Sequence, residues 1–333
     1  MDFESELARL AEPIAPEAPC GESLEDTPTL AAFDAYRLFG QLTARDNDVD
    51  WRDVRSASLA ALARSKDFRV LAHLAAATAH GESLSEALQV FPLIQQWLES
   101  YWDEVYPRID SDAIMRKNAL GDFADRVAVI DGLRRLPLVV HPQLGSFSLR
   151  DIDIVTGAQA NPDPDNQPRS QNELEAALKN SDARPLAHIS SLAAKARASL
   201  EASQEIMRVR GGNSSATPQL EALLAQLTRI QQIIGPRLAE SAESEYQTSE
   251  TGSDASSGSA QTVAVGAIKT RQDAIRALDA VASYFRRNEP SSPVPLIVER
   301  AKRMVTMDFL EVLADLAPDA LEQARKAAGV REN

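Results

Sequence analysis

Apolar residues recur at intervals of three and four along most of this chain, which is the spacing of amphipathic α-helices. The spacing predicts helices over 28–39, from Trp51, from Ser65, from Ser83 to Pro107, and over 116–135. Asp50 is the expected N-cap of the second helix, and Ser83 with Glu86 has the pattern of a capping box. Pro92 falls inside the helix from Ser83 to Pro107, so a kink or a break is predicted there.

The period changes after residue 135. β-Branched residues then alternate with others between prolines and glycines, which predicts two short strands, Leu136–Val140 and Ser146–Val155. The fold class expected from these patterns is mainly α and multi-domain, with a small β-hairpin near 136–155.

A second helical region begins near Asn172. It contains an apolar series with spacings of three, four, three and four, which is the seam of a helical hairpin or of a short coiled coil. The series consists of Leu220, Leu223, Leu227, Ile230 and Ile234. The preceding helix is the nearest partner for this seam, but pairing with another chain is the alternative. Thr217-Pro218 is expected to start the seam helix, and Gly235-Pro236 to end it.

A polar stretch of distinct composition lies between two helical regions. Between Glu240 and Ala260 the chain has five acidic residues, no Lys or Arg, and many serines and glycines. Such a stretch buries too little apolar area to offset its ordering entropy, so it is expected to be a flexible linker. The predicted organisation is an N-terminal helical domain (1–157), a loop (158–170), a middle helical hairpin (171–235), a flexible linker (236–268) and a C-terminal helical module (269–333).

The C-terminal module has about 65 residues, and a domain of that size is marginally stable alone. Self-association would add buried apolar area, so its apolar stripes are candidates for an oligomer interface. These candidates are Ile275, Leu278, Phe285, Ile297, Met304, Phe309 and Leu313.

The net charge of −14 changes the range of plausible partners, because such a chain repels phosphate backbones and anionic membranes. No nucleic-acid partner is therefore expected. The charge is uneven: from Lys269 to Asn333 there are 11 Lys or Arg and 10 Asp or Glu, a net of +1, which leaves −15 upstream. The C-terminal module could therefore meet acidic partners that the rest of the chain repels.

Candidate chemistry is sparse. The single cysteine, Cys20, cannot form an intrachain disulfide, and no acid or thiol completes a metal set around His73 and His80. Val263–Thr270 resembles the end of a phosphate-binding loop but lacks the glycines that such a loop needs. No catalytic residue, cofactor, metal or small-molecule substrate is expected, although an enzyme with an unrecognised site is one hypothesis kept open.

The N-terminus has no secretory signal pattern, and no apolar run reaches the roughly 20 residues that span a bilayer. A cytoplasmic protein is the expectation.

The densest aromatic group consists of Trp97, Tyr101, Trp102 and Tyr106. One interpretation is a core cluster with one exposed edge. The other is a partner surface, because Trp and Tyr are enriched in interface hot spots. On that second interpretation the chain is a helical protein-interaction adaptor, unrelated to secretion, that binds through the Trp97–Tyr106 surface.

Residues 10–155 also carry an ordered set of landmarks that resembles the ImpA-related N-terminal domain of TssA proteins from bacterial type VI secretion systems. The landmarks are Pro19-Cys20-Gly21-Glu22, Asp50-Trp51, Ala63-Arg64-Ser65-Lys66-Asp67, Tyr101-Trp102, Pro107, Asn118-Ala119-Leu120 and Ser148-Leu149-Arg150-Asp151. Towards the other end, Tyr284–Pro295 and Ala301–Leu313 resemble the short-form TssA branch, which is similar to contractile-phage baseplate components.

The resemblance implies a non-enzymatic scaffold that self-associates into a ring through its C-terminal region. The partners that it implies are type VI baseplate subunits, tube protein, spike and sheath, and indirectly the membrane complex. The location that it implies is the cytoplasm, with recruitment to the inner-membrane-anchored secretion complex.

Overall fold

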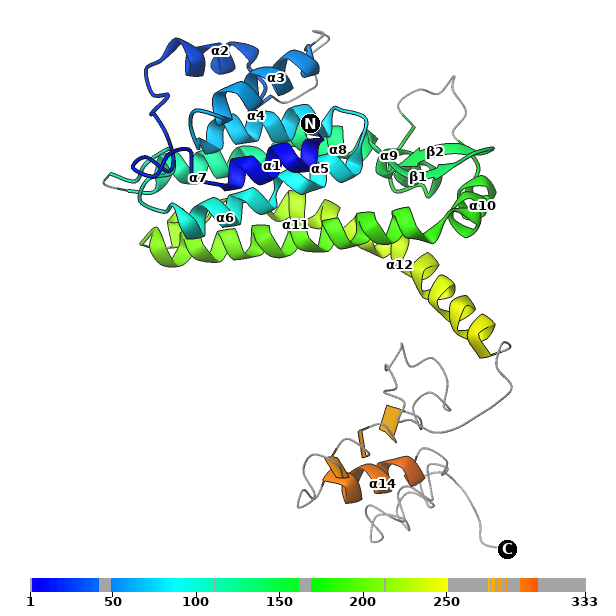
Figure 1. The fold of residues 1–333 in the computed structure, drawn as a ribbon. Helices are drawn as coiled ribbons and strands as arrows, with labels where there is room; N and C mark the ends of the chain where they lie inside the picture. The colour runs from blue at the N-terminus through cyan, green and yellow to red at the C-terminus, as the bar shows by residue number, and fades with distance from the viewer. Residues whose placement is uncertain are drawn as a thin grey trace, which may run out of the picture. The chain divides into compact units, whose positions relative to one another are not determined.

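The structure is a computed structural model that describes residues 2–41, 49–110, 112–161, 169–212 and 214–250, then 275, 277–278, 281–282, 285–286 and 294–304. The chain divides into two compact units, Met1–Ser253 and Asp254–Asn333. The first unit is mainly helical, as the sequence predicts, and contains one two-stranded sheet within its described residues (Figure 1).

Helix α4 (Phe68–Ala79) lies at the centre of the first unit, and all its residues except Arg69 are buried. Its neighbours include α2 (Pro28–Tyr36), α3 (Trp51–Leu62), α5 (Leu84–Val90) and α7 (Ile114–Gly121). The N-cap of α4 is Asp67, two residues after the predicted Ser65, while Asp50 caps α3 as expected. An alanine-rich helix suits this central place because small side chains let neighbouring helices approach closely.

Helix α6 (Pro92–Ser100) follows α5 after a break at Pro92, and this confirms the break predicted there. The predicted end of the helix at Pro107 is wrong, because α6 stops at Ser100 and Tyr101 leaves helical geometry at φ −132°. Residues 101–107 instead run as turns whose carbonyl groups are bound by a buried arginine described below.

The single helix predicted over 116–135 is also wrong. The segment contains α7, a 3-10 turn η1 (Asp122–Ala124), a π-helix η2 (Arg126–Asp131) and α8 (Gly132–Arg135). Asp125 interrupts the helix because its backbone is extended at ψ 130°. Its carboxylate then accepts the N–H groups of Val127 at 2.9 Å and Ala128 at 2.7 Å, which starts the next helical turn.

Strands β1 (Pro137–His141) and β2 (Gly145–Ser148) form the predicted hairpin, with antiparallel register. The second strand is much shorter than expected, because residues 149–155 form helix α9 (Leu149–Val155). Ser148 and Asp151 make a complete capping box at its start, and this local signal outweighs the β-branched residues that follow.

The predicted helical hairpin consists of α11 (Ala183–Arg210) and the first half of α12 (Glu221–Glu250), preceded by α10 (Gln171–Asn180). All five seam residues, Leu220 to Ile234, are at most 1% exposed, so the seam is filled within one chain. Helix α11 also packs along α5 and α6, as Figure 1 shows. The boundaries predicted at 157, 171 and 235 stay predictions, but the elements on either side of each lie in one unit.

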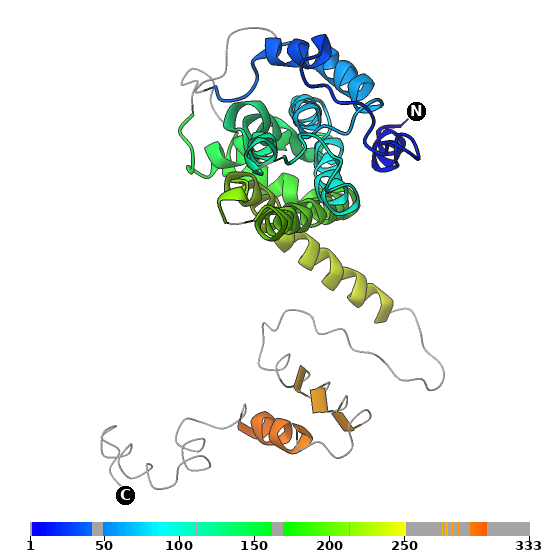
Figure 2. The ribbon, with the colours of Figure 1, turned by 90° about the vertical axis from the view of Figure 1, so that its left-hand side faces the viewer.

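The predicted helix end at Gly235-Pro236 is wrong, because α12 continues through Pro236 to Glu250. Arg237 donates to the Ser181 carbonyl oxygen at 3.1 Å, and Leu238 packs against the core. These contacts directly after Pro236 stabilise the helix where the proline removes a backbone hydrogen bond. Beyond these contacts α12 projects away from the rest of the first unit (Figures 1 and 2). Of the predicted linker, 236–250 is therefore helical, and 251–268 lies outside the described residues.

In the second unit the longest described element is α14 (Val294–Met304). It begins directly after Ser292-Pro293, where the sequence predicts a helix to open.

Candidate functional site

The four aromatic residues that the sequence offers as a candidate partner surface differ in their exposure. Trp97 is fully buried and Tyr106 is 8% exposed, while Tyr101 and Trp102 are half-buried. Trp97 and Tyr106 therefore belong to the core, and the surface interpretation is wrong for them. The sequence alone leaves the two interpretations open, because the acceptor of the Trp97 indole N–H, the Leu10 carbonyl oxygen, lies 87 residues earlier in the chain.

The first helix, α1 (Phe3–Ala11), is held at its C-terminus by two of the four aromatic residues, Trp97 and Tyr101. Trp97 Nε1 donates to the Leu10 carbonyl oxygen at 2.9 Å, and Tyr101 Oη donates to the Ala11 carbonyl oxygen at 3.1 Å. The last carbonyl groups of a helix have no partner inside it, so these bonds cap α1 from outside.

Lys66 completes this C-terminal clamp, which we define as Lys66, Trp97 and Tyr101. Its ammonium donates to the Leu10 carbonyl oxygen at 2.6 Å and lies 5.2 Å from the ring centre of Trp97 and 5.3 Å from that of Tyr101. Lys66 is fully buried, and burial lowers the pKa of its side chain to about 8. The aromatic faces and the carbonyl oxygen replace part of the hydration that the ammonium loses.

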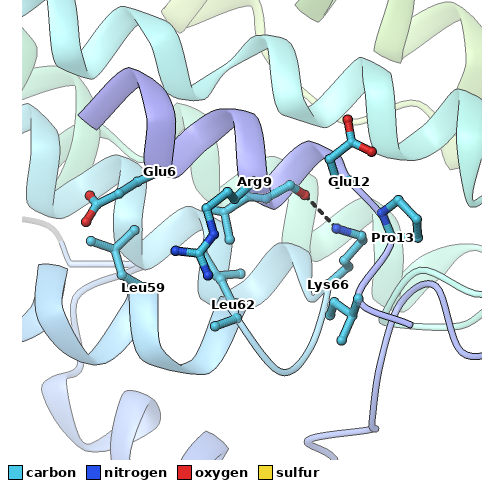
Figure 3. A pocket seen from close by; sticks show the side chains of 10 residues that line it. Glu6, Arg9, Glu12, Pro13, Leu59, Leu62 and Lys66 are labelled. Carbon is cyan, nitrogen blue, oxygen red and sulfur yellow. Dashed lines mark hydrogen bonds between the residues drawn. The ribbon is translucent and has the colours of Figure 1, made fainter. Parts of the chain in front are cut away.

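An open cavity of about 330 Å³ lies between α1 and the C-terminal end of α3, beside the clamp. Its apolar lining comes mainly from Leu59, Leu62 and Ile14. Figure 3 shows Glu6 and Arg9 of α1 on one side of this cavity, Leu59 and Leu62 on the other, and Lys66 at one end. Helix α1 is thus packed against α5 and α6 but stands apart from α3 at the cavity.

A second buried cation, Arg116, organises the turns after α6. It donates to the carbonyl oxygens of Trp102 at 2.8 Å, Val105 at 2.6 Å and Pro107 at 2.9 Å. Its guanidinium lies 4.9 Å from the ring centre of Trp102, and Arg210 lies 4.5 Å from the same ring centre. This explains the half-buried state of Trp102, since guanidinium groups from α7 and from the end of α11 lie against it.

The two histidines that the sequence singled out occupy different surroundings. His73 lies among aromatic rings, 4.9 Å from Phe33 and 4.8 Å from Phe39, while His80 stacks on Trp51. Burial lowers the pKa of both imidazoles, which favours their neutral forms. Within the described ranges, no three His, Cys, Asp or Glu residues are grouped so as to hold a metal ion.

Cys20 is buried, and burial raises the pKa of its thiol to about 11. A thiol with that pKa is a poor nucleophile near neutral pH. Its backbone has a structural part, because the Cys20 carbonyl oxygen accepts the Lys66 N–H at 2.9 Å.

The candidate oligomer residues of the C-terminal module are only partly described. Ile275, Leu278 and Phe285 are half-buried, and Ile297 on α14 is 64% exposed. Leu296 beside it, which the sequence analysis did not select, is 77% exposed. Met304 ends α14, while Phe309 and Leu313 lie outside the described residues.

No helix in the part of the chain that the structure describes is both long enough and apolar enough to span a membrane.

Comparison with known proteins gives consistent results. Residues 11–133 match the family described as ImpA, N-terminal, type VI secretion system. The type VI secretion system component TssA1 of Pseudomonas aeruginosa is 28% identical over 95% of this chain and 96% of its own length. A solved structure from Burkholderia cenocepacia, the N-terminal domain including the conserved ImpA_N region of its TssA component, covers 72% of this chain and 95% of its own. It aligns with a TM-score of 0.55 at 19% identity, a likeness of fold.

Proposed function

We propose that this chain is a TssA-type component of a type VI secretion system and acts there as a non-enzymatic assembly scaffold. The observation that carries the proposal is the extent of the similarity to TssA1, which covers 95% of this chain and 96% of that relative. A likeness over both whole lengths favours a shared role more strongly than a match of one domain alone.

The scaffold would self-associate into a ring through its C-terminal module. Leu296 and Ile297 support this, because two adjacent large apolar side chains on α14 are 77% and 64% exposed. A marginal module gains stability when such side chains are buried between copies, and copies of one chain associate with closed symmetry. Each ring would then present many first units, and weak contacts with partners would become strong through multivalency.

The partners of this ring would be type VI baseplate subunits, tube protein, spike and sheath, with an indirect link to the membrane complex. The chain would act in the cytoplasm, where it would be recruited to the inner-membrane-anchored complex. Its task would be to organise baseplate, tube and sheath assembly. The sparse chemistry of the described residues is compatible with a role that needs no catalysis.

A helical protein-interaction adaptor that binds through the Trp97–Tyr106 surface is a weaker candidate. Of its four aromatic residues, Trp97 and Tyr106 are buried, and the Trp97 indole N–H already donates to the Leu10 carbonyl oxygen.

Light scattering tests the ring by measuring the mass of the unaltered chain, of a double variant of α14 and of a control variant. We expect a large multi-subunit mass for the unaltered chain and a much smaller one for the double variant Leu296→Asp, Ile297→Asp. The matched control is Val140→Asp, because Val140 is also exposed, at 65%, but lies in the first unit. A monomeric unaltered chain would rule out the ring.

The assembly role is tested in the source bacterium by removing the chain and following a fluorescent sheath protein. Loss of sheath assembly, restored by the unaltered chain but not by the α14 double variant, is the expected result. Normal sheath assembly without the chain would contradict the proposal.

A further inference from the structure

Exposed apolar side chains gather where the start of α7 meets the end of α11. The described residues of the first unit contain four large apolar side chains that are strongly exposed: Ile114 and Met115 at 55%, Val209 at 61% and Val140 at 65%. All but Val140 lie within two residues of one contact between the helices, because a Cβ atom on Gly211 would lie 3.3 Å from the Cβ of Ala113. Single exposed apolar residues are ordinary on a protein surface, but a group of them marks an interaction site.

Trp102 joins the two helices at the same place. The centre of its ring lies 4.9 Å from the Arg116 guanidinium of α7 and 4.5 Å from the Arg210 guanidinium at the end of α11. The residue is half-buried, so part of it stays accessible. Trp, Met and Arg are enriched where proteins bind one another. We define the Trp102 patch as Trp102, Ile114, Met115, Val209 and Arg210.

Arg210 gives this patch a chemical preference. Its side chain is exposed, and its guanidinium lies over the Trp102 ring, which leaves the N–H groups at the edge of the guanidinium for other partners. Among the described residues Arg210 forms no ion pair, whereas its neighbour Arg208 is paired with Glu205. A planar guanidinium held by stacking matches the two oxygens of a carboxylate.

The acidic residues of the chain beside the patch do not supply that carboxylate. Asp112 accepts the backbone N–H of Ile114 at 3.0 Å. Asp103, directly after Trp102, is exposed and forms no ion pair in the part of the chain that the structure describes. The anion that fits Arg210 is therefore left for another molecule to provide.

We propose that the Trp102 patch is a docking surface for an acidic segment of another protein. Apolar side chains of that segment would lie against Ile114, Met115 and Val209, while one of its carboxylates binds Arg210. Symmetric pairing of two copies through this patch would bring Arg210 of both copies to one apolar centre, where like charges repel. The proposal is independent of the ring and of the secretion role, since it concerns only the first unit.

The first test maps what contacts the patch in the source bacterium. One full-length chain carries a photoreactive amino acid in place of Met115, and a control chain carries it in place of Val140, which is similarly exposed on β1. We expect position 115, but not position 140, to be linked to a segment of another protein that has apolar residues and more Asp and Glu than Lys and Arg. Adding Arg210→Glu to the first chain should reduce these links at least about tenfold, because it sets like charges against each other.

The second test uses a synthetic peptide with the sequence of the linked segment and measures its affinity for full-length chains by fluorescence anisotropy. The double variant Ile114→Asp, Met115→Asp should bind at least about tenfold more weakly, while Val140→Asp should bind like the unaltered chain. Arg210→Gln should weaken binding by about two- to fivefold, and Asp103→Asn should strengthen it by a similar factor, because it removes a repelling carboxylate. Thermal unfolding checks that the variants are folded, and Val209→Asp serves if the double variant is not.

Links from position 115 that are no more frequent than those from position 140 would overturn the proposal. Links only to another copy of this chain, or to a segment of net positive charge, would overturn it as well. So would a peptide whose affinity is the same for the unaltered chain, Arg210→Gln and the double variant, because the patch would then not be its site. Normal sheath assembly without the chain contradicts the proposed function but leaves each of these results interpretable.

Discussion

The rings of Trp51 and His80 lie face to face, with centroids 3.9 Å apart and planes 6° from parallel. Trp51 is the first residue of α3, and His80 is the C-cap of α4, so the stack joins the start of one helix to the end of its neighbour. The Nε2 atom of His80 is buried and makes no hydrogen bond among the described residues.

This arrangement predicts acid sensitivity. Burial lowers the pKa of His80 below its ordinary value of 6.5, so the unfolded chain takes up the proton first as pH falls. The free energy of unfolding contributed by His80 therefore decreases as pH falls through about 6.5 and below. Urea unfolding should show that the advantage of the unaltered chain over His80→Asn is smaller near pH 5 than near pH 7.5. A pH-independent difference would contradict the assignment.

Asp122 predicts the opposite pH dependence. Burial, with help from the nearby charge of Asp125, raises its pKa from 3.8 to about 7. The folded chain then binds more protons than the unfolded chain between these values, so stability is lost as pH rises through that window. Asp122→Asn should gain stability over the unaltered chain near pH 8, by at most about 4 kcal/mol, and little near pH 4. Urea unfolding at the two pH values measures the difference, and a larger gain near pH 4 would refute the prediction.

Gly132 predicts a steric limit. A Cβ atom at this position would lie 2.7 Å from His80 Cδ2 and 2.9 Å from the Ala79 carbonyl oxygen. Gly132→Ala should therefore destabilise the first unit by about 1–3 kcal/mol. Gly121 is the matched control, because a Cβ there meets nothing within 4 Å and the residue ends helix α7. Gly121→Ala should be neutral or stabilising by up to about 1 kcal/mol in thermal unfolding. Equal effects of the two substitutions would show that the contact is not limiting.

The two guanidinium groups over Trp102 predict unequal effects. Arg116 is fully buried and donates to three carbonyl oxygens, so Arg116→Met should cost about 3–5 kcal/mol. Arg210 lies as close to the ring but is exposed, so Arg210→Ala should cost about 1 kcal/mol or less. Chemical unfolding of both variants separates the contribution of buried hydrogen bonds from that of ring stacking. A smaller cost for Arg116→Met than for Arg210→Ala would reverse this interpretation.

Local signals in the sequence located many helix boundaries. Asp50, Ser83 and Pro92 each act at the position predicted, because a cap or a missing N–H works within one turn of the chain. The pairing of the seam from Leu220 to Ile234 with the preceding helix could also be predicted, since that helix is adjacent in the sequence. The helix α1 was missed although Asp2, Phe3, Leu7 and Leu10 carry its cap and its stripe.

Contacts between residues far apart in the sequence could not be predicted from it. Whether Trp97 faces a partner or the core depends on Leu10, and the path of α12 beyond Pro236 depends on the contact between Arg237 and Ser181. Neither contact produces a periodic pattern of apolar residues in the sequence, because each depends on how helices far apart in the sequence pack together. For Trp97 and Tyr106 the burial fits the interpretation as a core cluster, and for Tyr101 and Trp102 the partner surface stays a prediction.

The packing of α11 on α5 and α6 has a consequence for synthesis. Leu186, Ala193, Ala196 and Leu200 of α11 are buried, yet they follow the end of α6 by roughly 90–100 residues. A ribosome that adds about 5–20 residues per second needs roughly 5–20 s to make the chain from Ser100 to Arg210. During that interval α11 is not yet available to cover the apolar face of α5 and α6. That exposed face makes the nascent chain a target for ribosome-associated chaperones and for premature association with other nascent chains on the same mRNA.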